Sequence, residues 1–213
     1  MEKIINKIKI REGGFDSFYS ALVEASRKDR SSNFLLNNLV EVFIYFKFLF
    51  DNVNDILIFT ETLDFLPSVY IKAKGECIEN NQLKQQEKLQ EFWKSLEAFV
   101  NNENNKIQVV YREYNEKDIV SKSQHLKSIL SIASSKQTIQ FWQLNPELSL
   151  IQGMSFFILV PQYDMVYTAQ EVDAKTWNVC YFKNKEMYNS AKGLYDCFLE
   201  LSEAKKIDNY VNE

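Results

Sequence analysis

The sequence predicts an α/β fold with a mixed sheet, in which an antiparallel meander extends a parallel core and helices flank both faces. Three short apolar runs alternate with helical patterns in the middle of the chain, as parallel strands joined by crossover helices do. Two further extended runs flank Pro161-Gln162-Tyr163-Asp164, a segment typical of a hairpin turn. An amphipathic segment then closes the chain.

Apolar residues recur at helical spacing in five segments of the chain. Between them lie short runs rich in branched and aromatic residues, which favour strands. The predicted helices are 15–28, 34–46, 80–102, 119–133 and 185–206, and the predicted strands are 56–59, 107–111, 138–144, 156–160, 165–168 and 177–182.

The chain of 213 residues is short enough for one domain, because chains usually divide beyond about 250–300 residues. Neither a linker rich in Pro, Gly or Ser nor a repeat of fixed period divides the sequence. We therefore expect a single α/β domain over residues 1–213, with an N-terminal helical extension at 1–32 and a core at 33–206.

Composition disfavours several classes of protein. The formal net charge is −4, with acids and bases mixed along the chain, so a nucleic-acid partner held by a basic surface is not favoured. The amino terminus is unlike a secretory signal, and the apolar segment 42–50 is far shorter than the ~20 residues of a membrane span. Cys77, Cys180 and Cys197 have neither zinc nor redox spacing. We expect a cytoplasmic protein with buried, reduced thiols and no membrane partner.

The single histidine, His125, stands two residues before Lys127. An H-x-K pair is a weak candidate for phosphodiester hydrolysis, in which histidine attacks phosphorus and lysine holds the phosphate oxygens. However, the pair lies inside a helical pattern, and Ile132 occupies the place where the motif H-x-K-x-x-x-x-D has its aspartate. A helix-packing or surface histidine is the simpler interpretation.

Acidic residues follow two of the predicted parallel strands. Open α/β sheets bind ligands at the carboxyl ends of their strands, and carboxylate oxygens are ligands that Mg²⁺ prefers. Glu61, Arg112, Glu113 and Gln143 are therefore the candidate ligand-binding residues. We expect no cofactor, but Mg²⁺ held by carboxylates such as Glu61 and Glu113 stays open, beside the alternative of solvated loop charges.

The order of elements from Asn33 onward resembles one half of the phospholipase D-like fold. The residues that carry this resemblance are the strands 54–59, 106–111 and 139–142 with their preceding helices, and then the hairpin 155–171, a strand and a closing helix. The resemblance implies that residues 33–206 form the phospholipase D-like core. It also implies that the catalytic histidine and lysine belong on the strand that begins near Met154.

That strand reads Met154-Ser155-Phe156-Phe157-Ile158-Leu159-Val160-Pro161, without histidine or lysine, and no G-S-x-N motif follows. By this resemblance the chain is a degenerate member that lacks the catalytic residues, and family members with a single half commonly pair. The leading hypothesis is a non-catalytic, homodimeric domain that binds a protein or small molecule. The alternative is a phosphodiesterase or nuclease-type hydrolase using a carboxylate metal site or His125 and Lys127.

Overall fold

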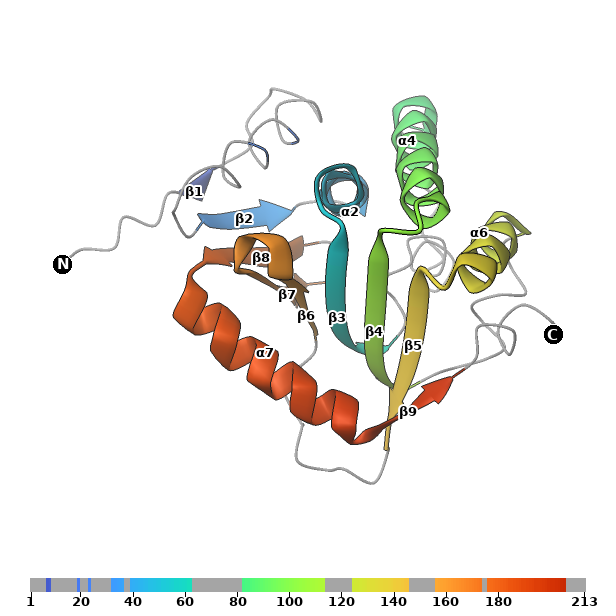
Figure 1. Ribbon diagram of the computed structural model, residues 1–213. Coiled ribbons are helices and arrows are strands. Elements are labelled where there is room, and N and C mark those ends of the chain that lie inside the picture. Colours follow the sequence, from blue (N-terminus) through green and yellow to red (C-terminus); the bar gives the residue numbers. More distant parts are fainter. Residues whose placement is uncertain are drawn as a thin grey trace.

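The computed structural model describes residues 7–8, 19, 23, 32–36, 39–62, 82–113, 124–145, 156–173 and 176–205. Nine strands of these residues form one mixed sheet in the order β1-β2-β8-β7-β6-β3-β4-β5-β9 (Figure 1). The strands are β1 (Lys7–Ile8), β2 (Ser32–Leu36), β3 (Asp55–Thr62), β4 (Lys106–Glu113), β5 (Ile139–Leu144), β6 (Phe156–Val160), β7 (Met165–Asp173), β8 (Thr176–Lys183) and β9 (Ser202–Lys205).

Strands β3, β4 and β5 run parallel, and the chain returns between them through helices. Strands β6, β7 and β8 form an antiparallel meander beside β3, and β9 pairs antiparallel with the opposite side of β5. A parallel pair needs a long crossover, whereas the three-residue 3₁₀ turn η2 (Pro161–Tyr163) is enough to join β6 to β7. The predicted mixed sheet is confirmed.

Helices flank both faces of the sheet, as predicted. Helices α2 (Leu39–Asn52), α4 (Gln82–Asn101) and α6 (Gln124–Lys136) cover one face, and α7 (Lys185–Glu200) crosses the other (Figure 1). Because strand side chains alternate between faces, adjacent residues of β3 serve different cores: Ile58 faces α2 and α4, whereas Phe59 faces α7. The central strands are thus apolar on both sides.

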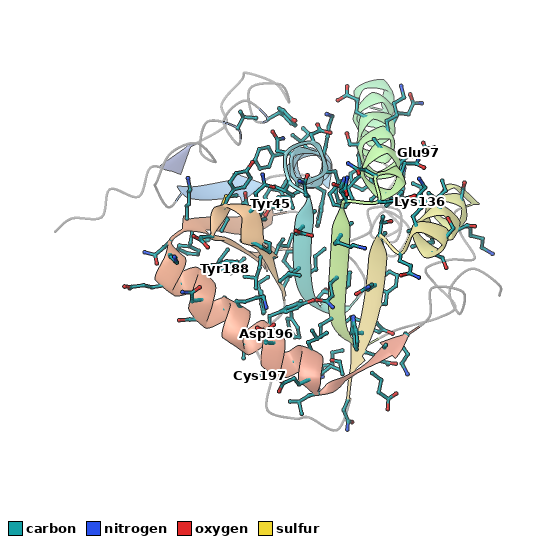
Figure 2. The ribbon with its side chains drawn as sticks, in the orientation of Figure 1. Tyr45, Glu97, Lys136, Tyr188, Asp196 and Cys197 are labelled. Carbon is teal, nitrogen blue, oxygen red and sulfur yellow. The ribbon has the colours of Figure 1, made fainter. Side chains whose placement is uncertain are left out.

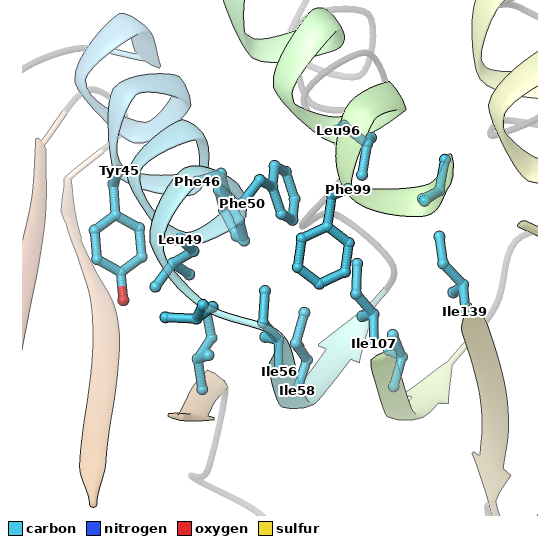
Figure 3. Close-up of a cluster of buried hydrophobic side chains, with 14 of the residues drawn as sticks. Tyr45, Phe46, Leu49, Phe50, Ile56, Ile58, Leu96, Phe99, Ile107 and Ile139 are labelled. Carbon is cyan, nitrogen blue, oxygen red and sulfur yellow. The ribbon is translucent and has the colours of Figure 1, made fainter. Parts of the chain in front are cut away.

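The larger core lies beneath α2 and α4 (Figure 3). Phe50 of α2 lies with its ring centroid 5.5 Å from Phe99 and 5.7 Å from Phe92 of α4, so aromatic contacts join the two helices. Below them Ile56 and Ile107 extend from neighbouring parallel strands. Helix α4 therefore follows the predicted segment 80–102, because its apolar stripe is buried in this core.

A second, smaller core holds α7 against the opposite face. Phe59 lies 4.6 Å from Phe198 of α7 between ring centroids, and Tyr195 is fully buried with its hydroxyl donating to the carbonyl oxygen of Gln108 at 3.0 Å. The helix begins after Asn184, whose side chain accepts a hydrogen bond from the backbone N–H of Met187 at 3.0 Å. Tyr195 and Phe198 thus fix α7 to the sheet, and Asn184 caps the start of the helix.

Polar contacts join the carboxyl end of α4 to the end of α6 and to the residue before β5. Lys136, the last residue of α6, donates from Nζ to the carbonyl oxygen of Asn101 at the end of α4 at 2.8 Å (Figure 2). Gln137 then turns the chain with a left-handed φ of 55°, and the hydroxyl of buried Thr138 donates to the carbonyl oxygen of Val100 at 3.1 Å. These bonds satisfy helix-end carbonyls that have no partner within their helix.

Two predicted helices differ from the structure. The helix predicted at 34–46 is a strand up to Leu36 (β2), and α2 begins only at Leu39. The helix predicted at 185–206 ends at Glu200, and Ser202–Lys205 form β9. In both places backbone pairing with a remote strand, β8 or β5, outweighs the local helical pattern.

Within the residues described, no helix is long and apolar enough to cross a membrane. Of the predicted helix 15–28, only Tyr19 and Val23 are described, and both are helical. Cys180 is half-buried, whereas Cys197 is exposed on α7, contrary to the expectation of buried thiols (Figure 2). Cys77 lies outside the described residues.

Candidate functional site

The carboxyl ends of the parallel strands meet the beginning of β6 at one edge of the sheet. In register, Thr60 of β3 lies opposite Tyr111 of β4 and Phe156 of β6, and Tyr111 lies opposite Gln143 of β5. We call this row of four residues the carboxyl edge. Ligands in open α/β sheets bind outside the carboxyl ends of the parallel strands, which is where this row lies. The sequence predicted a site at this edge.

The part of β6 that reaches the carboxyl edge is apolar. Phe156 is half-buried and packs against the core beneath α2 and α4, and the next four residues are buried. Phe157 stacks on Phe59 with 5.2 Å between ring centroids and 22° between ring planes. Aromatic packing thus fills both faces of the sheet at this point, and β6 contributes no group there that is able to act as a nucleophile or a general base.

Two of the candidate ligand-binding side chains, Arg112 and Gln143, do not converge. Thr60 and Tyr111 are only 4% and 1% exposed, so their hydroxyls lie within the packed interior. Arg112 and Gln143 are both half-buried, but they point to different faces of the sheet. Gln143 is in register with Tyr111 and shares its face, whereas Arg112 follows Val110 on the face of α7. The sequence did place both residues at one edge, but strand alternation separates their side chains.

Glu61 and Glu113 lie near the ends of adjacent strands, as expected. Thr62 is paired in register with Glu113, so the backbones of the two candidate positions are neighbours at the edge of the sheet. Their side chains lie outside the described ones. Among the side chains that are described, no three of His, Cys, Asp and Glu gather closely enough to hold a metal ion.

His125 and Lys127 both lie in the first turns of α6. On a strand, positions two apart project in the same direction, but on a helix they are about 200° apart around the axis. A helical H-x-K pair is therefore unable to present both side chains to one phosphate. Position 125 is also roughly 16 Å along the helix axis from Lys136 at the other end of α6, at 1.5 Å per residue. The side chain of His125 is outside the described ones.

A polar cluster at the end of α2 was not predicted from the sequence. The hydroxyl of Tyr19 donates to Oδ2 of Asp51 at 2.8 Å, and Lys47 donates to the same oxygen at 2.6 Å while its Nζ lies 4.9 Å from the centre of the Tyr19 ring. Asn52 donates to the Tyr19 hydroxyl at 3.2 Å. Burial and the bond to Asp51 raise the pKa of Tyr19 to about 12, so the hydroxyl stays protonated at neutral pH.

Tyr19 and Asp51 are 32 residues apart, so no local spacing in the sequence announces their contact. The cluster joins the part of the chain around Tyr19 to α2. Its four side chains bind one another, which is a structural role.

Comparison with known proteins gives likenesses of structure alone. No protein-family profile matches the sequence, and no curated protein matches it. Similar solved structures include TrmBL2, an archaeal chromatin protein with a novel mode of DNA binding, at 10% identity and a TM-score of 0.47 over 89% of this chain. The present chain spans 63% of that protein.

Two phospholipase D family members are also similar to the chain. Nuc from Salmonella typhimurium has 10% identity and NucT from Helicobacter pylori 9%, each with a TM-score of 0.47 over 83% of this chain and 99% of the other.

Proposed function

We propose that this chain is a non-catalytic interaction domain that self-associates, and that it is a degenerate phospholipase D-like domain. The observation that carries the proposal is the apolar start of β6 at the carboxyl edge. In the resemblance drawn from the sequence, the catalytic histidine and lysine belong on this strand. Phe156 and Phe157 pack there into two different cores, which is a structural use of both positions.

Two of the candidate pairs are poorly arranged for catalysis. General acid–base or nucleophilic catalysis needs at least two reactive groups within hydrogen-bond reach of one reacting atom. Near the carboxyl edge Arg112 and Gln143 face opposite sides of the sheet, and His125 and Lys127 are two positions apart on a helix. Self-association follows from the same resemblance, because single-half members of that family commonly pair.

The proposal is tested by hydrolysis of bis(p-nitrophenyl) phosphate and of single-stranded DNA, with and without Mg²⁺ or Mn²⁺. We expect no turnover above a blank without protein. The alternative hydrolase predicts turnover that is lost in Glu113→Ala or His125→Ala but kept in Glu97→Ala, a control on the exposed face of α4. Such a pattern would overturn the non-catalytic proposal.

Self-association is measured separately, by light scattering on a sizing column. The proposal expects a species of twice the 25.1 kDa of one chain. A strict monomer at all concentrations would refute the self-association part and leave the result on catalysis unaffected.

A further inference from the structure

Strand β9 ends the described sheet on the side of β5. It pairs antiparallel with β5, with Lys205 opposite Phe141 and Glu203 opposite Gln143 (Figure 1). Among the described strands none pairs with its other side. An open strand edge presents backbone donors and acceptors to which another chain can add a strand.

The backbone groups of β9 that point away from β5 follow from one hydrogen bond. The N–H of Asn145 donates to the carbonyl oxygen of Leu201 at 3.4 Å, which makes 145–201 a hydrogen-bonded pair of the antiparallel ladder. Such pairs alternate with non-hydrogen-bonded ones, so Glu203 and Lys205 also direct their backbone groups toward β5. The outward N–H and C=O groups are those of Ser202 and Ala204.

The side chains of β9 suit pairing with a second copy of itself. Glu203 is 85% exposed and accepts from Nζ of Lys205 at 3.2 Å, so the two charges share one face of the strand. An exposed pair of this kind contributes little to stability and is easily exchanged. Between them stands Ala204, one of the two residues whose backbone groups point outward.

Charge selects one register for such a pairing. With Ala204 opposite Ala204 of the second copy, each Glu203 lies directly opposite a Lys205. Shifting the two-fold axis to Glu203 sets carboxylate against carboxylate, and shifting it to Lys205 sets ammonium against ammonium. In the first register the two charge pairs are also the non-hydrogen-bonded ones, whose Cα atoms are closer, at about 4.5 Å.

We propose that two copies of this chain pair through antiparallel β9 edges about a two-fold axis at Ala204, which joins their sheets into one. The inference rests on the proposed self-association and names its surface. Ala204 exchanges two backbone hydrogen bonds across the axis, and two Glu203–Lys205 pairs flank them. Leu201, the C-cap of α7 immediately before β9, is 51% exposed and adds apolar surface beside the contact.

The first test replaces Ala204, because its N–H points outward. Ala204→Pro removes this donor without removing a bond to β5, and proline is tolerated on edge strands where the N–H faces solvent. By sedimentation velocity we expect dimers in wild type and in the control Ala204→Ser, and monomers in Ala204→Pro. A dimer that survives in Ala204→Pro, with the wild-type unfolding temperature, would refute this surface and leave self-association standing. A monomeric wild type would refute both.

The second test exchanges charges, and it does not depend only on loss of association, because a mixture of two variants should regain it. Glu203→Lys and Lys205→Glu each turn two attractive pairs into repulsive ones, so each variant alone should dissociate at least about tenfold more readily than wild type. A mixture of the two variants restores both attractive pairs and should form heterodimers. Failure of the mixture to associate, with both variants folded, would overturn the proposed register.

Discussion

Tyr195 offers a quantitative test of how α7 is attached to the sheet. The ring is fully buried, and its hydroxyl donates to the carbonyl oxygen of Gln108 at 3.0 Å. Burial, and secondarily the charge of Asp196, hold the pKa of Tyr195 far above its ordinary value. Tyr195→Phe keeps the ring and removes the hydroxyl, so at pH 7 we expect the free energy of unfolding to fall by about 1 kcal/mol.

At alkaline pH the effect should reverse. Above about pH 10 the tyrosine of the unfolded chain ionises while the folded one stays neutral, so the wild type loses about 1.4 kcal/mol of stability per pH unit at this residue. The contribution is complete below pH 10 and declines as the pH rises toward the folded pKa. The phenylalanine variant has no such loss, so the two stabilities should become equal at about pH 10.7, and the variant should be slightly more stable at pH 11.

Urea unfolding followed by tryptophan fluorescence at pH 7, 9, 10 and 11 measures this difference. Ionisation of other groups affects both proteins equally and cancels in the comparison. Phe198→Leu, in the same core, is the control, and its effect should not vary with pH because neither side chain titrates. A difference between wild type and Tyr195→Phe that stays constant from pH 9 to pH 11 would refute the reasoning.

Two further predictions concern the same side of the molecule. Phe59→Ala should lower the free energy of unfolding by about 3–5 kcal/mol, because Phe59 is fully buried between Phe157 and Phe198; a loss below about 1 kcal/mol in chemical denaturation would contradict that packing. Gly193→Ala should stabilise the protein by about 1 kcal/mol, since Gly193 lies within α7 and a Cβ there meets no atom within 4 Å. A lower melting temperature for Gly193→Ala in calorimetry would show that the site is crowded.

Catalysis and binding make different demands on the carboxyl edge. A binding domain needs a surface, whereas an enzyme needs side chains that converge on one reacting atom. Phe156 and Phe157 pack into two cores and so stabilise the sheet, at the position where the resemblance implies reactive groups. The hydrolysis assay with Glu113→Ala and His125→Ala distinguishes an enzyme from a binding domain.

The position of the candidate site was predictable, but its composition was not. Glu61, Arg112, Glu113 and Gln143 do lie near the ends of three parallel strands, because apolar runs separated by helices dictate parallel crossovers. The opposite directions of Arg112 and Gln143 depend on the register between strands. Register is fixed by which residues each core buries, and this information is absent from the spacing of the candidates along the chain.

The sequence by itself determined the elements whose apolar pattern matches the faces that they bury. Strands β3, β4 and β5 and helix α4 follow runs that are apolar on the faces they bury, so local periodicity and tertiary burial agree. Only the tertiary structure decided β2 and β9. Residues Ser202–Lys205 include good helix formers, yet they extend as a strand, because the open side of β5 offers backbone partners that a helix end lacks. The edge on which the proposed dimer depends is therefore a product of long-range pairing, which local propensity does not show.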